Sequence, residues 1–296
     1  MRFKRFPPWW SHLLIPKASR RSAQAGIALY APCTARAVFV QQVAWLAVQH
    51  FGTFALPGRA RSWVPPMGEA TWRKIASALE GHFGAFHELA IYQQTQPERA
   101  GVALLVLRRG QPLCFVKLRP VSNERLADEE RALRAVWAFG PRTFAVPEPL
   151  VSETVDGWRF LAVSALPSEL HRVPIDPPLK AICAEIGDAL ACLPRPAGIP
   201  SHWVPMHGDL TPWNLRTFKE HGLVLVDWEA SAWGPPGADE VFYRAGIRAL
   251  RRGGISSRAG LEAIEFWRSR LVHMPTTSRD RRLRTSLLRA LQEMTS

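Results

Sequence analysis

The residue types best suited to catalysis gather in one loop and at the end of a later hydrophobic run. The loop carries His207, Gly208, Asp209 and Asn214 in the pattern H-G-D-x-x-x-x-N, and thirteen residues further on the run ends at Asp227. These groups could serve phosphoryl transfer. A hydroxyl acceptor needs a carboxylate to orient it and take its proton, and nucleotide phosphates need Mg²⁺ with hard oxygen ligands. Asp209 could supply the first function, and Asn214 and Asp227 the second.

The spacing of these residues predicts that they share one cavity. A glycine opens the loop and a proline bends it, so that Asp209 and Asn214, five residues apart, can point the same way. The run Leu223–Val226 is short, apolar and β-branched, which predicts a buried strand with Asp227 at its end. Each acid alone could be a turn residue or a helix cap. The joint pattern therefore carries the functional interpretation.

The sequence HGDLTPWN, followed by VLVDWEASAWGPPGADE, resembles the aminoglycoside phosphotransferase/choline kinase family, which has a protein-kinase-like fold. The motifs match over about residues 206–243, more loosely over about 86–193, and not before about Met67. The resemblance implies an α+β fold of two lobes, with a small N-terminal β-sheet lobe and a larger helical C-terminal lobe. It also implies an enzyme that uses ATP.

The resemblance assigns roles to individual residues. It implies that Asp209 is the catalytic base, that Asn214 and Asp227 are Mg²⁺ ligands, and that Asp239 is a structural acid of the C-terminal lobe. We expect His207 to orient the catalytic loop by hydrogen bonding without titrating.

A lysine upstream lies where such a fold needs one. Residues 101–107 and 113–118 read as two strands around a turn at residues 109–112, and Lys117 ends the second strand. Lys117 fits the family's phosphate-contacting lysine. The alternative is a strand-end lysine that points into solvent.

The next segment, residues 123–137, predicts a helix, because apolar residues recur at helical spacing among strong helix formers. Glu129 and Glu130 could each turn inward and pair with Lys117. The family places the acid four residues before a packed leucine, which is Leu133 here, and this favours Glu129.

Two further strands, residues 149–154 and 158–163, flank a turn that contains a glycine and predict another hairpin. The segment Ser164–Pro167 then follows as the hinge between lobes. Since the hinge backbone pairs with adenine in kinase-like folds, Ser164 and Leu166 are the predicted nucleotide-binding positions. The order of the elements is the basis of this assignment.

The absence of two phosphate-binding motifs narrows the class of kinase. No G-x-G-x-x-G loop precedes Lys117, where the hairpin His87–Leu107 turns at residues 96–101 with a single glycine. No P-loop occurs either. Enzymes of the family that the sequence resembles often lack the glycine-rich pattern too, so the resemblance implies a small-molecule kinase. A catalytically idle nucleotide-binding scaffold is the alternative, and a protein kinase is the third choice.

Length and composition fit one two-lobed unit. The 296 residues divide into an N-terminal extension (1–66), an N-lobe (67–166) and a C-lobe (167–296). Helices are predicted in the C-lobe over residues 179–193, 241–252, 261–271 and 281–294. The four cysteines form no C-x-x-C pair, which indicates reduced packing residues of an intracellular, cytoplasmic protein.

The net charge is unevenly distributed. Residues 1–68 hold nine Lys/Arg and no acid, and residues 244–296 hold twelve Arg and four acids, which leaves residues 69–243 at −4 of the total +13. In the family the acceptor pocket is built largely from C-terminal helices. An arginine-rich lining there would repel polycations, so we expect a small-molecule hydroxyl acceptor that is not polycationic. The alternative is a solvated basic face that serves solubility. Because members of the family act on hydroxyls of sugars and amino alcohols, the resemblance implies a saccharide or saccharide-linked acceptor. Nucleic acid is not an expected partner.

The N-terminal segment allows three interpretations. Residues 37–58 contain no Asp, Glu, Lys or Arg, but glutamines interrupt the apolar run. The segment could be a helical extension packed on the N-lobe, an interfacial element at an anionic membrane on the inner face of the cell, or a single span, which needs about 20 mainly apolar residues. A cleavable signal peptide is not expected, because the apolar run starts too late.

Overall fold

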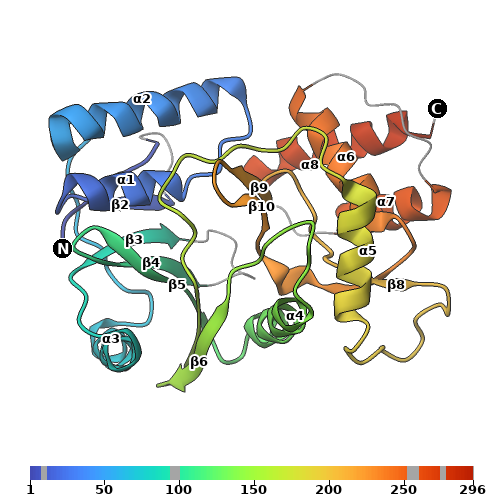
Figure 1. Ribbon diagram of the computed structural model, residues 1–296, viewed down its shortest axis with the longest axis horizontal. Helices are drawn as coiled ribbons and strands as arrows, with labels where there is room; N and C mark the ends of the chain where they lie inside the picture. The colour runs from blue at the N-terminus through green and yellow to red at the C-terminus, as the bar shows by residue number, and fades with distance from the viewer. Residues whose placement is uncertain (8–11, 94–100, 252–259, 274–277, 296) are drawn as a thin grey trace. The chain divides into compact units, whose positions relative to one another are not determined.

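The computed structural model describes residues 1–7, 12–93, 101–251, 260–273 and 278–295. The chain folds as two compact units. The N-terminal unit comprises Met1–Leu126 and Pro147–His171, and the C-terminal unit comprises Ala127–Val146 and Arg172–Ser296. The predicted α+β class is confirmed: the first unit contains an antiparallel sheet, and the second is mainly helical (Figure 1). The predicted domain boundaries after residues 66 and 166 stay predictions.

A seven-stranded antiparallel sheet forms the centre of the N-terminal unit, in the order β1-β2-β3-β4-β5-β7-β6. The strands are β1 (Phe3–Arg5), β2 (Leu13–Pro16), β3 (Glu88–Gln93), β4 (Val102–Arg108), β5 (Gln111–Pro120), β6 (Pro149–Val155) and β7 (Trp158–Val163). The predicted hairpins around residues 109–112 and 155–157 are therefore present. The first predicted hairpin is present as β3 and β4, but residues 96–100 of its turn lie outside the described residues.

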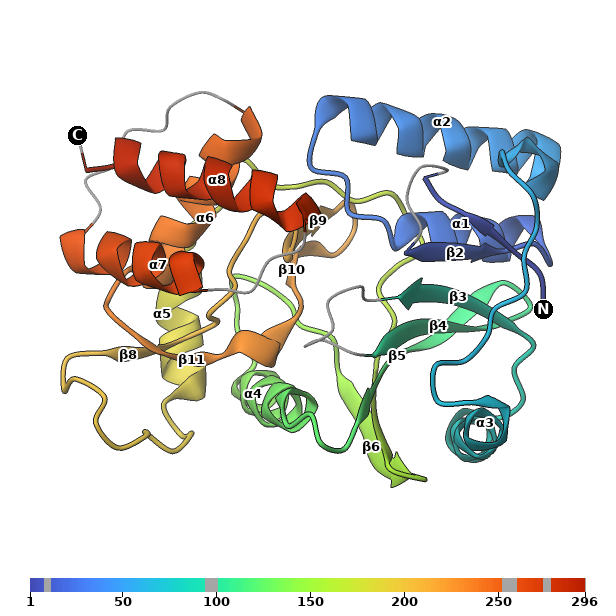
Figure 2. The same ribbon diagram turned by 180° about the vertical axis from the view of Figure 1, so that it is seen from behind.

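Helices cover both faces of this sheet. They are α1 (Arg20–Ala28), α2 (Ala35–Phe51), the 3₁₀ turn η1 (Gly52–Ala55) and α3 (Glu69–Phe83). Ile75 and Leu79 of α3 pack on one face with Leu104 and Val116. Alanines and leucines of α1, β3 and β4 form the core on the other face. Helix α2 lies on the far side of α1 from the sheet, as both views show (Figures 1 and 2).

The N-terminal extension is helical as predicted, but it also contributes two strands. Strand β1 pairs with β2, and β2 pairs with β3, so residues 1–66 continue the sheet of the N-terminal unit. Within the described part of the chain, none of the helices has the length and apolarity needed to cross a membrane.

The C-terminal unit combines helices with two small ribbons of two strands each. Its helices are α4 (Arg125–Phe139, whose first two residues belong to the other unit), α5 (Leu179–Leu190), α6 (Ala238–Arg251), α7 (Leu261–His273) and α8 (Ser278–Glu293). The four helices predicted for this region are present with ends shifted by a few residues, and Arg252 lies outside the described residues. Phe242 and Trp267 stack at 3.8 Å in the core that joins α6, α7 and α8.

Candidate functional site

The predicted catalytic residues lie on two loops of the C-terminal unit. Each loop begins and ends at a strand of the two small two-stranded sheets. Residues 207–214 connect β8 (Val204–Met206) to β9 (Leu215–Phe218), and residues 226–231 connect β10 (Gly222–Leu225) to β11 (Ala232–Gly234). Strand β8 pairs with β11 and β9 pairs with β10, both antiparallel. The two loops, called the paired loops below, are therefore held side by side.

Val226 fastens the second loop to the first. Its backbone N–H donates to the carbonyl oxygen of Asn214 at 3.0 Å, and its carbonyl oxygen lies 3.2 Å from Nε2 of His207. Val226 directly precedes Asp227 in the chain. These two bonds therefore fix the backbone that carries Asp227 against the backbone that carries Asp209.

His207 is fully buried and has both ring nitrogens engaged. Its Nδ1 accepts the backbone N–H of Asp209 at 3.2 Å, which leaves Nε2–H to donate to the carbonyl of Val226. One nitrogen accepts and the other donates, so the imidazole is neutral. The ring also lies 4.6 Å from that of Trp228. His207 thus orients the loop by hydrogen bonding.

Asn214 holds the carboxylate of Asp209. Its Nδ2 donates to the carbonyl oxygen and to the Oδ2 of Asp209, both at 3.0 Å. The amide nitrogen is committed to these bonds, and the amide oxygen is the atom of Asn214 suited to a cation. Asp209 itself is only partly buried.

Gly208 allows the paired loops to approach each other. Its φ of +74° lies in the left-handed region, and an added Cβ would lie 2.0 Å from the carbonyl oxygen of Ala230. No side chain fits at that distance, so glycine is required here.

Asp239, at the start of α6, binds the backbone of the first paired loop at His207 and Gly208. Its carboxylate accepts the backbone N–H groups of His207 at 2.7 Å and Gly208 at 3.1 Å. Burial raises the pKa of Asp239 to about 6, although these hydrogen bonds and Arg270 act in the opposite direction. The loss of hydration therefore outweighs the bonds that favour the charged form.

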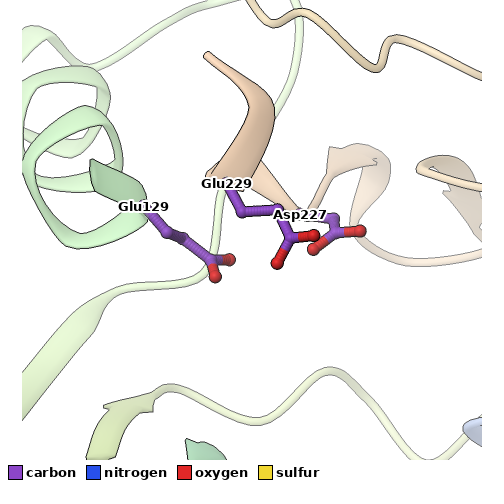
Figure 3. A group of neighbouring side chains, drawn as sticks. All are labelled: Glu129, Asp227 and Glu229. Atoms are coloured by element: carbon purple, nitrogen blue, oxygen red, sulfur yellow. The ribbon is translucent and has the colours of Figure 1, made fainter. Parts of the chain in front are cut away.

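Three carboxylates gather at the second of the paired loops. Among the described residues, Glu129 of α4, Asp227 and Glu229 offer oxygen atoms that all lie within 4.8 Å of one another (Figure 3). Like charges at this distance repel, and a bound cation would relieve the repulsion. Carboxylate and amide oxygens are hard ligands, so this donor set fits Mg²⁺. Asp227 adopts a φ of +71°, an uncommon conformation for a residue other than glycine that often marks functional sites.

The structure distinguishes the two candidate glutamates of α4. Glu129 is buried and points toward Asp227 and Glu229 (Figure 3). Glu130 instead accepts from Arg134, one turn further along the same helix, at 3.0 Å. The helix therefore presents Glu129, and not Glu130, to the acidic group.

The predicted nucleotide contacts lie in the N-terminal unit. Lys117 lies in the interior strand β5, opposite Ala103 of β4 and Leu161 of β7. Ser164 follows β7, where its N–H donates to the carbonyl of Glu148 and its Oγ accepts the N–H of Glu148, both at 2.8 Å. Leu166, two residues further on, is half-buried. The pairing of Lys117 with Glu129 and the contact of the hinge with adenine stay predictions.

Two contributors were missed from the sequence. Glu229 stands two residues after Asp227, and the pattern D-x-E at a strand end is the signal that could have revealed it. Val226 carried no such signal, because its role depends on backbone hydrogen bonds that any residue other than proline could make.

Residues 192–243, which contain both paired loops, match the model of the phosphotransferase enzyme family. This is the family expected from the sequence. The predicted resemblance is thereby confirmed over the segment that contains the catalytic motifs. A search of curated proteins found no match.

Solved structures of small-molecule kinases show a weaker similarity. A putative fructosamine-3-kinase from Haemophilus somnus 129PT is 13% identical, with 76% of this chain and 98% of that chain covered at a TM-score of 0.42. An aminoglycoside phosphotransferase in complex with GDP and kanamycin is 14% identical, with 75% and 98% covered at a TM-score of 0.44. An aminoglycoside phosphotransferase from Streptomyces rimosus, in complex with ADP and streptomycin, is 14% identical, with 75% and 97% covered at 0.40.

Proposed function

We propose that this protein transfers the γ-phosphoryl group of ATP, with Mg²⁺, to a hydroxyl group of a small molecule. The observation that carries the proposal is the pair of hydrogen bonds that joins the backbone of Val226 to Asn214 and His207 of the first paired loop. It sets the acid suited to metal binding, Asp227, beside the loop that carries the acid suited to proton transfer, Asp209. The match of the same segment to the phosphotransferase enzyme family supports this assignment.

Asp209 is the proposed catalytic base. The amide of Asn214 donates to its Oδ2 at 3.0 Å and so orients the carboxylate that would accept a proton from an acceptor hydroxyl. The carboxylate is partly exposed, which gives an acceptor access to it. Asp239 and His207 act as positioning residues, because they fix the backbone of the loop and not the reacting atoms.

The proposed metal ligands are the amide oxygen of Asn214 and the carboxylates of Asp227 and Glu229. Mg²⁺ bound there would neutralise charge on the nucleotide phosphates. Glu129 belongs to the same acidic group, and in this proposal it also pairs with Lys117, which contacts the phosphates. The hydrogen bond of the Ser164 N–H to Glu148 means that adenine would rely on the carbonyl of Ser164 and on the backbone of Leu166.

The proposed acceptor carries a hydroxyl group, such as a saccharide or saccharide-linked molecule, and is not a polycation. We exclude a polycation because arginines outnumber acids in residues 244–296 and their positive charge would repel it. Three of these arginines pair with acids of the same unit, namely Arg244 with Glu240, Arg248 with Glu293, and Arg268 with Glu265. The region stays basic after these pairs are set aside, because nine of its twelve arginines and two of its four acids remain.

A phosphate-transfer screen tests the proposal. The purified protein is incubated with Mg·ATP and a metabolite panel that contains neutral sugars, sugar phosphates, sugar acids and aminoglycosides, and ADP release is recorded with Asp209→Asn as the matched control. We expect acceptor-dependent ADP release from a neutral or anionic sugar that is lost in the variant. Nucleotide binding without transfer to any compound would instead indicate an idle scaffold. Preference for an aminoglycoside would contradict the charge argument.

A further inference from the structure

Helix α2 exposes large apolar side chains on the side that does not face α1. Phe39, Val43 and Leu46 are 65%, 48% and 50% exposed, and they follow one another at helical spacing along one stripe. Phe51 and Phe54, at the end of α2 and in η1, are 74% and 82% exposed. These five residues are called the α2 face below. Large apolar side chains left exposed along one helix and the turn that follows it can form a surface that binds a partner or a membrane.

The opposite side of α2 is already committed to the core of the N-terminal unit. Val48 is fully buried there with Ile27 of α1 and Leu13 of β2, and Trp45 packs against the same core. Gln41 anchors the helix, because its side-chain amide nitrogen, Nε2, donates to the carbonyls of Ile27 at 3.0 Å and Tyr30 at 2.7 Å. The orientation of α2 is thus fixed, and the α2 face is directed outward.

A helix that is apolar on both sides is normally covered on both sides. From Ala37 to Phe51 the helix contains no Asp, Glu, Lys or Arg. The core of the N-terminal unit covers one side of it, and the other side is the exposed stripe. The composition of α2 therefore favours an apolar binding partner or an apolar environment at the α2 face.

The charges around the α2 face indicate which kind of partner binds there. Arg36 is exposed in the first turn of the helix, where the helix dipole already favours an anion. At the other end, Lys17 lies 5.1 Å from the ring of Phe54, and Arg20 donates to the carbonyl of Gln49 at 3.4 Å. Residues 1–68 contain nine Lys/Arg and no acid at all. Cations thus flank the apolar stripe at both ends.

From this arrangement we infer that the α2 face is a docking surface for an anionic lipid bilayer. Apolar side chains between flanking cations suit the boundary between acyl chains and anionic headgroups. A second copy of this chain fits less well, because a two-fold dimer would bring the same cations face to face. This inference is independent of the proposed phosphotransferase activity.

Vesicle co-sedimentation of the full-length protein tests the inference. One set of vesicles contains phosphatidylcholine with roughly 30% phosphatidylglycerol, and the other contains phosphatidylcholine alone. We expect about tenfold or more binding to the anionic set, because each cation near such a surface contributes about fivefold. Raising the salt concentration should weaken binding. No binding to anionic vesicles at low salt, or equal binding to both vesicle types, would overturn the inference.

Matched variants separate the α2 face from charge in general. The double variant Phe39→Glu/Leu46→Glu should lose vesicle binding by at least about tenfold, since two apolar groups can no longer insert. The control Leu261→Glu/Val272→Glu makes the same charge change at two exposed residues of α7 (68% and 58% exposed) and should retain binding. Phe39→Ser/Leu46→Ser provides a second test without added charge if the glutamate variant folds poorly. Unchanged binding of both α2 variants would overturn the inference.

Light scattering tests the alternative occupant of the α2 face, a second copy of this chain. We expect the molar mass of the protein in solution not to rise with its concentration through contacts of the α2 face. A dimer that forms with rising concentration and is lost in Phe39→Ser/Leu46→Ser would show that a second copy covers the face, and it would contradict the lipid assignment. Arg36→Gln and Lys17→Gln should each weaken vesicle binding about fivefold while leaving the mass unchanged.

Discussion

The paired loops of the C-terminal unit and helix α2 of the N-terminal unit differ in what they bury. The loops bury polar groups: His207, Asn214 and Asp239 are buried, and each makes hydrogen bonds that fix another part of the site. Helix α2 leaves apolar groups in water, with Leu46 half exposed. Buried polar groups are costly unless paired, and exposed apolar stripes are costly unless covered. In the paired loops hydrogen bonds offset this cost, whereas on the α2 face the apolar side chains stay exposed, and both features point to a use beyond folding.

A large effect in this comparison is expected at the acidic group. Asp227→Ala removes one of the proposed Mg²⁺ ligands, so turnover and metal-dependent nucleotide affinity should both fall, turnover by about 10²–10³-fold. Glu229→Gln keeps the size of the side chain and should give a smaller loss of the same kind. Calorimetric titration with Mg·ATP measures the affinity. Unchanged affinity and an unchanged metal requirement in Asp227→Ala would show that Asp227 is not a ligand.

Asp239 should make stability depend on pH. Its folded-state pKa of about 6 lies above the ordinary value of 3.8, so its contribution to stability is fully present below about pH 3.8 and is lost as pH rises through 6. At most about 3 kcal/mol is involved. Urea unfolding of wild type and Asp239→Asn between pH 4.5 and 7.5 measures this, because asparagine does not titrate.

The expected result is that the stability of wild type relative to Asp239→Asn declines over this pH range. A constant offset, from the lost hydrogen bond of the variant, should remain throughout. If the relative stability of wild type rose with pH instead, the hydrogen bonds from His207 and Gly208 would outweigh the burial of the carboxylate.

A smaller effect is expected for the glutamates of α4. Glu129→Gln should lower kcat or raise the nucleotide KM by about tenfold, as a milder form of Lys117→Ala, because the lysine is only misplaced. Glu130→Gln breaks an exposed pair with Arg134 and should change activity little. Steady-state kinetics of the two variants is the measurement. A silent Glu129→Gln with a damaging Glu130→Gln would refute the orientation of α4 seen here.

The sequence predicted the parts of the site that have distinctive side chains. The motif residues Asp209, Asn214 and Asp227 were recognised with their spacing, because carboxylate and amide groups at fixed positions restrict the chemistry. The strands β8, β9 and β11 were not predicted. Each has only three or four residues, too few for an alternating pattern, and depends on its partner strand for stability.

The contribution of residues 1–66 to the sheet was also missed. Strand β1 has three residues, two of them basic, and β2 ends in Pro16. Neither is a strand by composition; their pairing with β3 comes from tertiary packing. The apolar character of α2 was recognised from the sequence. Which of its sides faces outward depends on its packing against α1, and this was available only from the structure.

The smallest expected effect lies on α2 and separates its two sides. Val43→Ala, on the exposed stripe, should change the free energy of unfolding by less than about 0.5 kcal/mol. Val48→Ala makes the same chemical change on the buried side and should cost about 2 kcal/mol, since it removes apolar groups from the core. Urea unfolding without lipid measures both. Equal costs would mean that the protein covers the α2 face by itself.

The central claim is that Asp209 takes the proton of the acceptor while the neighbouring loop binds the metal. The most direct test is Asp209→Asn, with phosphate transfer and Mg·nucleotide binding measured on the same preparation. General-base assistance is worth about 10²–10⁴-fold, so turnover should fall by that factor while nucleotide affinity stays within about twofold of wild type. Turnover equal to that of wild type would contradict the account.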